Sequence, residues 1–197
     1  MTALLVSNVV LWIVVVALVF VLLALTRQVG VLHERVAPAG ALMINRGPAV
    51  GKPVVPLEVT DLEGQLLHIG APSADGRSTL IVFVSPTCPV CKTLLPVIRA
   101  SHTQERDWLR VVLASDGEPQ EHLRFVQRQE LNGVPYVVSA LLGLRYQVNR
   151  LPFAALVDPD GVLRARGLVN SREHLESLFE AQRLGMASLQ EYFASRA

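Results

Sequence analysis

The sequence has little cysteine, no excess of either sign of charge and no internal repeat. Two cysteines among 197 residues exclude a small domain held together by several disulfides. Eighteen Lys and Arg stand against seventeen Asp and Glu, and the basic residues are scattered, so no phosphate-binding surface is expected. No period of about 20 to 50 residues recurs, which excludes solenoids and propellers. We therefore expect neither a nucleic-acid partner nor a repeat architecture.

Apolar residues are abundant and unevenly distributed. They make up 51% of the chain against 18% for charged residues. The run from Ala3 to Leu25 has 23 residues without a charge, and its only polar side chains are Ser7 and Asn8. As a helix, this run is long enough to cross a hydrocarbon layer of about 30 Å. The sequence therefore predicts a transmembrane anchor at residues 1–26, which would place the protein in a membrane.

The sequence also bears on whether this anchor is retained in the mature protein and on its orientation in the membrane. A cleaved signal peptide is the alternative, but it would need a basic start, a shorter apolar run and a nearby small-residue cleavage site. The sequence favours a retained anchor. Arg27 and Arg35 follow the run, so the positive-inside rule alone would place the rest of the chain in the cytoplasm.

The remainder of the chain divides into a linker and an α/β domain. Proline and glycine interrupt any regular period in residues 27–51, which predicts a linker, and the folded domain is expected over residues 52–197. Strands and helices alternate in this domain and end in a hairpin, which is typical of a mixed sheet flanked by helices. The expected strands are 57–60, 66–69, 80–84, 109–114, 136–138, 153–157 and 162–166; the expected helices are 92–100, 121–130, 140–148 and 171–181, with a further turn at 189–193.

Both cysteines lie in one Cys-Pro-Val-Cys motif that follows a buried strand and opens a helix. Proline suits the first helical turn, and Pro89 lies there. The free N–H groups of the helix start stabilise a thiolate, so Cys88 is the expected nucleophile. Cys91 is one helical turn further on and can attack a mixed disulfide held on Cys88, which makes it the expected resolving cysteine.

A zinc site or two inert thiols are the alternatives to a redox pair. Zinc normally needs four ligands, and no second pair of ligands stands at a suitable spacing. The five histidines are isolated, and we expect them on the surface with no role in the site: His33, His68, His102, His122 and His174. The sequence predicts no metal site, and no cofactor other than the dithiol of Cys88 and Cys91.

These residues resemble the thioredoxin superfamily over about residues 52–181. Lys92 follows the second cysteine, Pro96 lies five residues after it, and Leu151-Pro152 precedes the 153–157 strand. The resemblance implies a thioredoxin-like fold, a cis peptide bond before Pro152, and a client-binding surface around the dithiol. The expected substrate-binding residues are therefore Thr87, Pro89, Leu151 and Pro152.

The sequence resembles, more narrowly, the MauD family of methylamine utilization proteins. The matching stretches are residues 151–161 and 167–174, and the resemblance includes the N-terminal anchor. It implies a single-pass protein of the bacterial inner membrane with its C-terminal domain in the periplasm, contrary to the positive-inside rule. It also implies a thiol–disulfide oxidoreductase that helps to mature the disulfide-rich small subunit of methylamine dehydrogenase, together with an unidentified membrane or periplasmic thiol redox partner.

The sequence also departs from the thioredoxin pattern. Val82 stands six residues before Cys88, where thioredoxins have a buried acid, and Thr87 replaces the usual tryptophan. The acceptor for the proton of Cys91 is therefore missing at that position. Two alternative functions stay open: a periplasmic reductant for cytochrome c maturation, and a non-catalytic module that holds a client or delivers a metal on the same fold.

Overall fold

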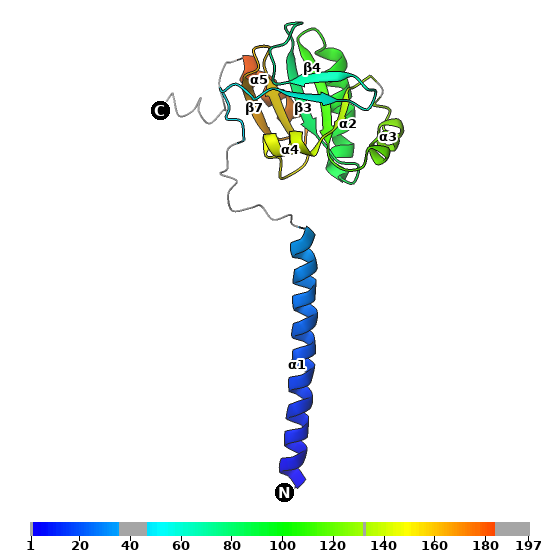
Figure 1. Cartoon of the computed structure of the whole chain (residues 1–197), viewed down its shortest axis with the longest axis vertical. Helices are drawn as coiled ribbons and strands as arrows, with labels where there is room; N and C mark the ends of the chain where they lie inside the picture. The colour runs from blue at the N-terminus through cyan, green and yellow to red at the C-terminus, as the bar shows by residue number, and fades with distance from the viewer. Residues whose placement is uncertain (1, 36–46, 132, 184–197) are drawn as a thin grey trace. The chain divides into compact units, whose positions relative to one another are not determined.

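The computed structural model describes residues 2–35, 47–131 and 133–183, which belong to two compact units, Met1–Asn45 and Arg46–Ala197 (Figure 1). The described part of the first unit is a helix, α1 (Thr2–Arg35). Among the described residues, no helix has both the length and the apolar character that a membrane crossing requires. The turn expected at residues 189–193 lies outside the described part of the chain.

The two ends of the expected linker are part of the ordered structure: one end continues helix α1, and the other is hydrogen-bonded within the second unit. Helix α1 continues to Arg35, beyond the residue at which the anchor was expected to end. At the other end, the N–H of Gly51 donates to the carbonyl of Leu163 over 2.7 Å, and Pro53 forms an isolated bridge with Val162. Residues 36–46 of the expected linker lie outside the described part.

A five-stranded mixed sheet forms the centre of the second unit. Its strand order is β5-β4-β3-β6-β7, with β3, β4 and β5 parallel to one another and β6 and β7 joined by antiparallel pairing. A separate antiparallel pair, β1-β2, precedes it. The strands are β1 (Leu57–Thr60), β2 (Leu66–Ile69), β3 (Ser78–Phe83), β4 (Leu109–Ser115), β5 (Tyr136–Val138), β6 (Phe153–Val157) and β7 (Leu163–Leu168).

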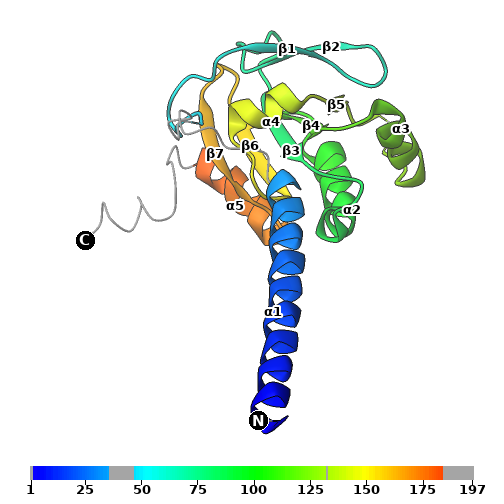
Figure 2. The ribbon, with the colours of Figure 1, turned by 60° about the horizontal axis from the view of Figure 1, so that its bottom comes forward.

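Helices cover both faces of this sheet, which confirms the expected thioredoxin-like α/β architecture. Figure 2 shows α2 and α5 on one side of the sheet, and α4 with the β1-β2 pair on the other. We name these the α2 face and the α4 face. The helices are α2 (Pro89–Gln104), α3 (Pro119–Arg128), α4 (Ala140–Tyr146) and α5 (Arg172–Arg183).

Alternation along the strands distributes the core between the two faces. Successive side chains of a strand point to opposite sides. In β3, Leu80 and Val82 therefore join the core of the α2 face, whereas Ile81 and Phe83 join that of the α4 face. Because both sides of β3 are buried, its sequence is continuously apolar rather than alternating.

Two helices end earlier than the sequence pattern predicted. Helix α3 ends at Arg128 instead of residue 130, and α4 ends at Tyr146 instead of residue 148. The chain leaves each helix through a residue with positive φ, Glu130 at 51° and Gln147 at 53°. Neither is a glycine, the residue that usually marks such a helix end, so the sequence carried no signal for these two stops.

Candidate functional site

A short loop links the end of β3 to the first cysteine. The N–H of Cys88 donates to the carbonyl of Ser85 over 3.1 Å. The hydroxyls of Ser85 and Thr87 lie 2.9 Å apart, and the N–H of Thr87 donates to Ser85 Oγ over 3.3 Å. These local bonds hold the loop, so the position of Cys88 is fixed relative to the central strand.

Cys88 and Cys91 are joined by a disulfide at the start of α2. Cys88 is the N-cap residue, and its Sγ accepts a hydrogen bond from the N–H of Cys91 over 3.1 Å. Pro89 occupies the first turn, as predicted. Cys88 is partly exposed, whereas Cys91 is fully buried in the core of the α2 face. A partner molecule can therefore reach only the first sulfur directly.

The Leu151-Pro152 segment lies at the same edge of the sheet as the disulfide. Strand β6 begins directly after Pro152, and its Phe153 pairs with Phe83 at the end of β3. The peptide bond between Leu151 and Pro152 is cis, as the resemblance implied. Pro152 is buried, and Leu151 has 38% of its surface exposed. The fold thus brings together two segments that are about 60 residues apart in the sequence.

The backbone of Leu151 is available to a partner. The carbonyl of Pro152 accepts the N–H of Val169 over 3.1 Å, so that group is already used. No hydrogen bond joins the N–H or carbonyl of Leu151 to any residue in the described part of the chain. Thr87 and Pro89, the other two expected substrate-binding residues, are exposed beside the disulfide. Thr87 and Pro89 flank Cys88 in the chain, and Leu151 and Pro152 lie at the same end of the sheet as the loop that leads to it.

The position of the missing acid is filled by a tightly packed valine. Val82 is fully buried on the same face of β3 as Cys91, and it lies between Leu113 of β4 and Ala154 of β6. These neighbours are all apolar. The environment below Cys91 is therefore built to exclude a charge rather than to hold a carboxylate.

A buried histidine–tyrosine pair on the α2 face corrects the expectation that His122 lies on the surface. His122 is 1% exposed; its Nδ1 lies 2.9 Å from the hydroxyl of Tyr136 and its Nε2 lies 2.9 Å from the carbonyl oxygen of Asp116. Burial raises the pKa of Tyr136 to about 12. His122 and Phe125 are one helical turn apart on α3, and this spacing was the available sign that His122 points inward.

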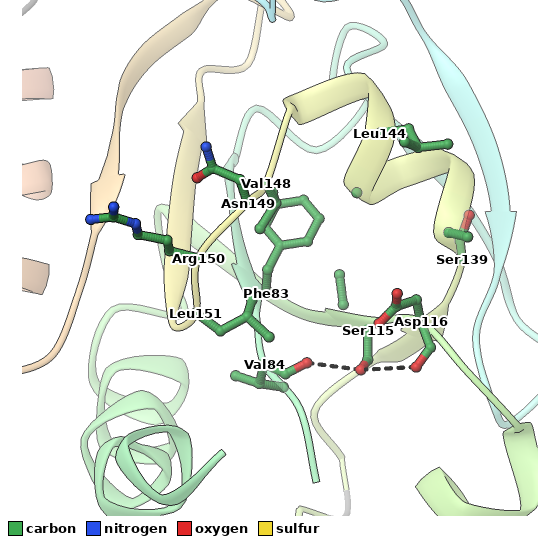
Figure 3. A pocket seen from close by; sticks show the side chains of 13 residues that line it. Phe83, Val84, Ser115, Asp116, Ser139, Leu144, Val148, Asn149, Arg150 and Leu151 are labelled. Carbon is green, nitrogen blue, oxygen red and sulfur yellow. Dashed lines mark hydrogen bonds between the residues drawn. The ribbon is translucent and has the colours of Figure 1, made fainter. Parts of the chain in front are cut away.

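A cavity of about 340 Å³ lies on the α4 face, next to the Leu151-Pro152 segment. Figure 3 shows the side chains that line it. The cavity is bordered by the ends of β3 and β4, by α4 and by residues 148–151. No sequence pattern predicted this cavity, because its walls come from four separate parts of the chain. Within the described residues, no group of three His, Cys, Asp or Glu side chains is placed to hold a metal ion.

Comparison with known proteins places this geometry in a family. A thioredoxin-like domain model matches residues 70–183. The chain is 46% identical to the methylamine utilization protein MauD of Methylorubrum extorquens, over 100% of this chain and 95% of that protein, and 47% identical to MauD of Paracoccus versutus, over 100% and 98%. The crystal structure of StoA from Bacillus subtilis has the same fold, with 22% identity and a TM-score of 0.54 over 67% of this chain and 99% of that chain. The chain therefore belongs to the MauD family of methylamine utilization proteins and carries a thioredoxin-like domain with a cysteine pair at Cys88 and Cys91.

Proposed function

We propose that the protein is a thiol–disulfide oxidoreductase in which Cys88 is the nucleophile and Cys91 the resolving cysteine. The observation that carries this proposal is the unequal burial of the two bonded sulfurs, with Cys88 accessible at the helix start and Cys91 enclosed. The N–H that now donates to Cys88 Sγ would also stabilise the Cys88 thiolate in the reduced protein. No cofactor besides the dithiol is required for this chemistry.

The proposed reaction is a sequence of two exchanges. In the reduced protein, the Cys88 thiolate attacks one sulfur of a client disulfide, which forms a mixed disulfide and releases the other client sulfur as a thiolate. The Cys91 thiolate then attacks Cys88 Sγ and releases the second client thiolate. The client gains two electrons and the protein is left with the Cys88–Cys91 disulfide. If a thiolate of a different client cysteine instead attacks the client sulfur of the mixed disulfide, a new client disulfide forms, Cys88 leaves as a thiolate, and the client is isomerised while the protein is regenerated.

An extended client segment fits beside Leu151. Its backbone would pair with the unused N–H and carbonyl of Leu151, in the manner of a strand added to a sheet edge. Pro152, Thr87 and Pro89 would form the surroundings of the bound client cysteine. When the protein ends a turnover oxidised, a dithiol redox partner in the membrane or periplasm must return the two electrons.

We also propose that residues 1–26 anchor the protein in the bacterial inner membrane with the thioredoxin-like domain in the periplasm. The support comes from the uncharged run of residues 3–25 and from the exposure of consecutive large apolar side chains such as Leu11, Trp12 and Ile13. A helix that is apolar on all sides is suited to lipid. A reporter fused after Ala197 should be active only if it is of the periplasmic type; activity of a cytoplasmic type would refute this orientation.

The proposed client is the small subunit of methylamine dehydrogenase. Two points support this client. The chain belongs to a family named for methylamine utilization, and the resemblance to that family implies a client subunit that is rich in disulfides. Six cysteines can pair in 15 ways and eight in 105, so correction of wrong pairs is needed before the subunit is stable.

The test of this client is a strain that carries Cys88→Ser. Transcription and export of the small subunit should be unchanged, while its correctly paired form should be depleted; the large subunit should be affected only as a consequence. A strain with Thr93→Ser, a conservative change on the exposed side of α2, serves as the control and should behave like the wild type. Normal disulfide pairing of the small subunit in the Cys88→Ser strain would refute the assignment.

A further inference from the structure

The cavity on the α4 face adjoins the proposed client-binding segment. Leu151 lines the cavity and also precedes Pro152 in the chain, and Val84 lines it at the start of the loop that leads to Cys88. Successive side chains of an extended segment point to opposite sides. A client strand that pairs with Leu151 and presents its cysteine to Cys88 would therefore direct a neighbouring side chain toward this cavity.

The wall of the cavity is mainly apolar and open to solvent. Phe83 lies at its centre in Figure 3, with Leu144 and Leu151 on opposite sides. Leu144 has 60% of its surface exposed although it lies on a short helix packed against the sheet. An aliphatic stem of three or four carbons would cover these side chains and remove apolar surface from water.

Two charged side chains line this cavity, Asp116 and Arg150, and neither has an ion-pair partner among the described residues. Asp116 follows β4, and its backbone carbonyl is held by the side chains of Ser115 and His122, at 3.5 Å and 2.9 Å. Its carboxylate makes no hydrogen bond or ion pair with any residue in the described ranges. Arg150 is the basic residue in the lining of the cavity, and Figure 3 shows its side chain directed away from the cavity. A single negative group therefore stands beside an apolar recess.

We propose that this cavity binds a lysine or arginine side chain of the client, next to the client cysteine. This inference rests on the proposed function and adds a preference for one class of sequence. The aliphatic stem of the basic residue would pack against Phe83, Leu144 and Leu151, and its charged end would meet Asp116. A purely apolar side chain would cover Asp116 without compensating its lost hydration, and an acidic one would be repelled.

The first test measures binding without redox chemistry. Fluorescein-labelled decapeptides with serine in place of the client cysteine would carry Lys, Leu or Glu at the positions flanking that serine. Fluorescence anisotropy with the full-length oxidised protein in detergent should show the Lys peptide binding about tenfold tighter than the Glu peptide at low salt. Asp116→Asn should remove this preference, and Asp116→Lys should reverse it. Asp107→Asn, at a remote exposed carboxylate, should leave it unchanged.

A second variant tests the cavity itself. A Cβ added to Gly143 would meet no atom within 4 Å, and Gly143 lies within α4 with an ordinary backbone conformation. Gly143→Leu would therefore project into the recess without disturbing the helix, and it should weaken the Lys peptide at least as much as Asp116→Asn does. Lys preference that persists in Asp116→Asn, or unchanged binding in Gly143→Leu, would overturn the proposal.

A further experiment distinguishes an error in the proposed cavity from an error in the proposed oxidoreductase activity. The same peptides with cysteine restored and blocked as a mixed disulfide with glutathione would measure exchange with the reduced protein. Exchange that needs Cys88 but ignores the flanking residue would leave the oxidoreductase standing and refute the cavity. Lys-selective binding without any exchange would support the cavity and refute the oxidoreductase.

Discussion

The two faces of the central sheet differ in the surroundings of their buried tyrosines and in how completely they are filled. On the α2 face, the core encloses Cys91 and Val82, and the buried hydroxyl of Tyr136 lies within hydrogen-bond distance of His122. On the α4 face, the hydroxyl of Tyr146 has no hydrogen-bond partner among the described residues, and a cavity of about 340 Å³ opens beside Phe83. Alternate side chains of the same strands build both faces. The α2 face also holds buried polar atoms without a partner among the described residues, Nδ1 of His102 and Oε1 of Gln182, so the contrast lies in the two tyrosines and in the cavity. The α2 face positions the sulfur chemistry, and the α4 face offers room for a client.

Substitutions of the two cysteines should have the largest effect. They test whether burial of Cys91 in the α2 face determines which cysteine attacks the client first. Cys91→Ser should accumulate mixed disulfides between Cys88 and a client, since no second thiol can resolve them. Cys88→Ser should accumulate none, because Cys91 is fully buried. Non-reducing gels and mass spectrometry of the trapped species would measure this. Equal trapping by both variants would show that burial does not assign the roles.

Substitutions of Leu151 test whether the backbone of the client pairs with the backbone of Leu151, which lies beside the cavity of the α4 face. Proline has no N–H, so Leu151→Pro would remove the donor that the client is proposed to use. Exchange with a client disulfide should slow about tenfold, as expected for loss of one hydrogen bond at a binding edge. Leu151→Ala keeps the N–H and is the matched control. Both variants should form the Cys88–Cys91 disulfide with diamide at the wild-type rate, and equal exchange by the two would count against the pairing.

Alkaline pH should weaken the fold through its buried tyrosines. Burial raises the pKa of Tyr136 from 10 to about 12 in the folded protein, and burial also raises the pKa of Tyr146. Because the folded state keeps these protons longer, their contribution is complete below pH 10; that of Tyr136 is lost as the pH rises through 12, and that of Tyr146 falls in the same direction. Each tyrosine should cost up to about 1.4 kcal/mol per pH unit in that window. Urea unfolding at pH 9 and pH 11 measures this loss of unfolding free energy. The loss should be smaller in Tyr136→Phe than in the wild type.

The same two tyrosines give the smallest and sharpest contrast at neutral pH. Tyr136→Phe should lower the free energy of unfolding by about 1 kcal/mol, because Nδ1 of His122 loses its partner. Tyr146→Phe removes a hydroxyl without a partner in the described part and should be neutral or stabilising by up to about 1 kcal/mol. Urea unfolding at pH 7 distinguishes them. Equal destabilisation by both changes would remove the difference between the faces.

Much of the fold was accessible from local patterns. The continuous apolar run around Leu80 predicted a strand buried on both sides, and the Asp158–Gly161 turn predicted the hairpin of β6 and β7. The exact ends were less accessible. Strand β7 runs from Leu163 to Leu168 rather than over 162–166, because its pairing with β6 shifts register at Val157 and continues to Phe153.

The site was predictable only in its covalent part. A dithiol at a helix start follows from the order of strand, cysteine and proline, and the pairing of Cys88 with Cys91 needed only four consecutive residues. The cavity near Asp116 and the bond between His122 and Tyr136 depend on contacts between distant segments. Such contacts are set by how β4, β5 and α4 are placed in the sheet, and no short motif records that placement.

A redox titration of the full-length protein tests the central proposal most directly. The protein would be equilibrated in buffers with graded ratios of reduced to oxidised dithiothreitol, and free thiols would be labelled with a maleimide that shifts gel mobility. The proposal predicts that Cys88 and Cys91 convert together in one reversible two-electron step, with a slope of about 30 mV per tenfold change in ratio. Thiols that stay reduced or stay bonded over the whole range, or that titrate one at a time, would contradict it.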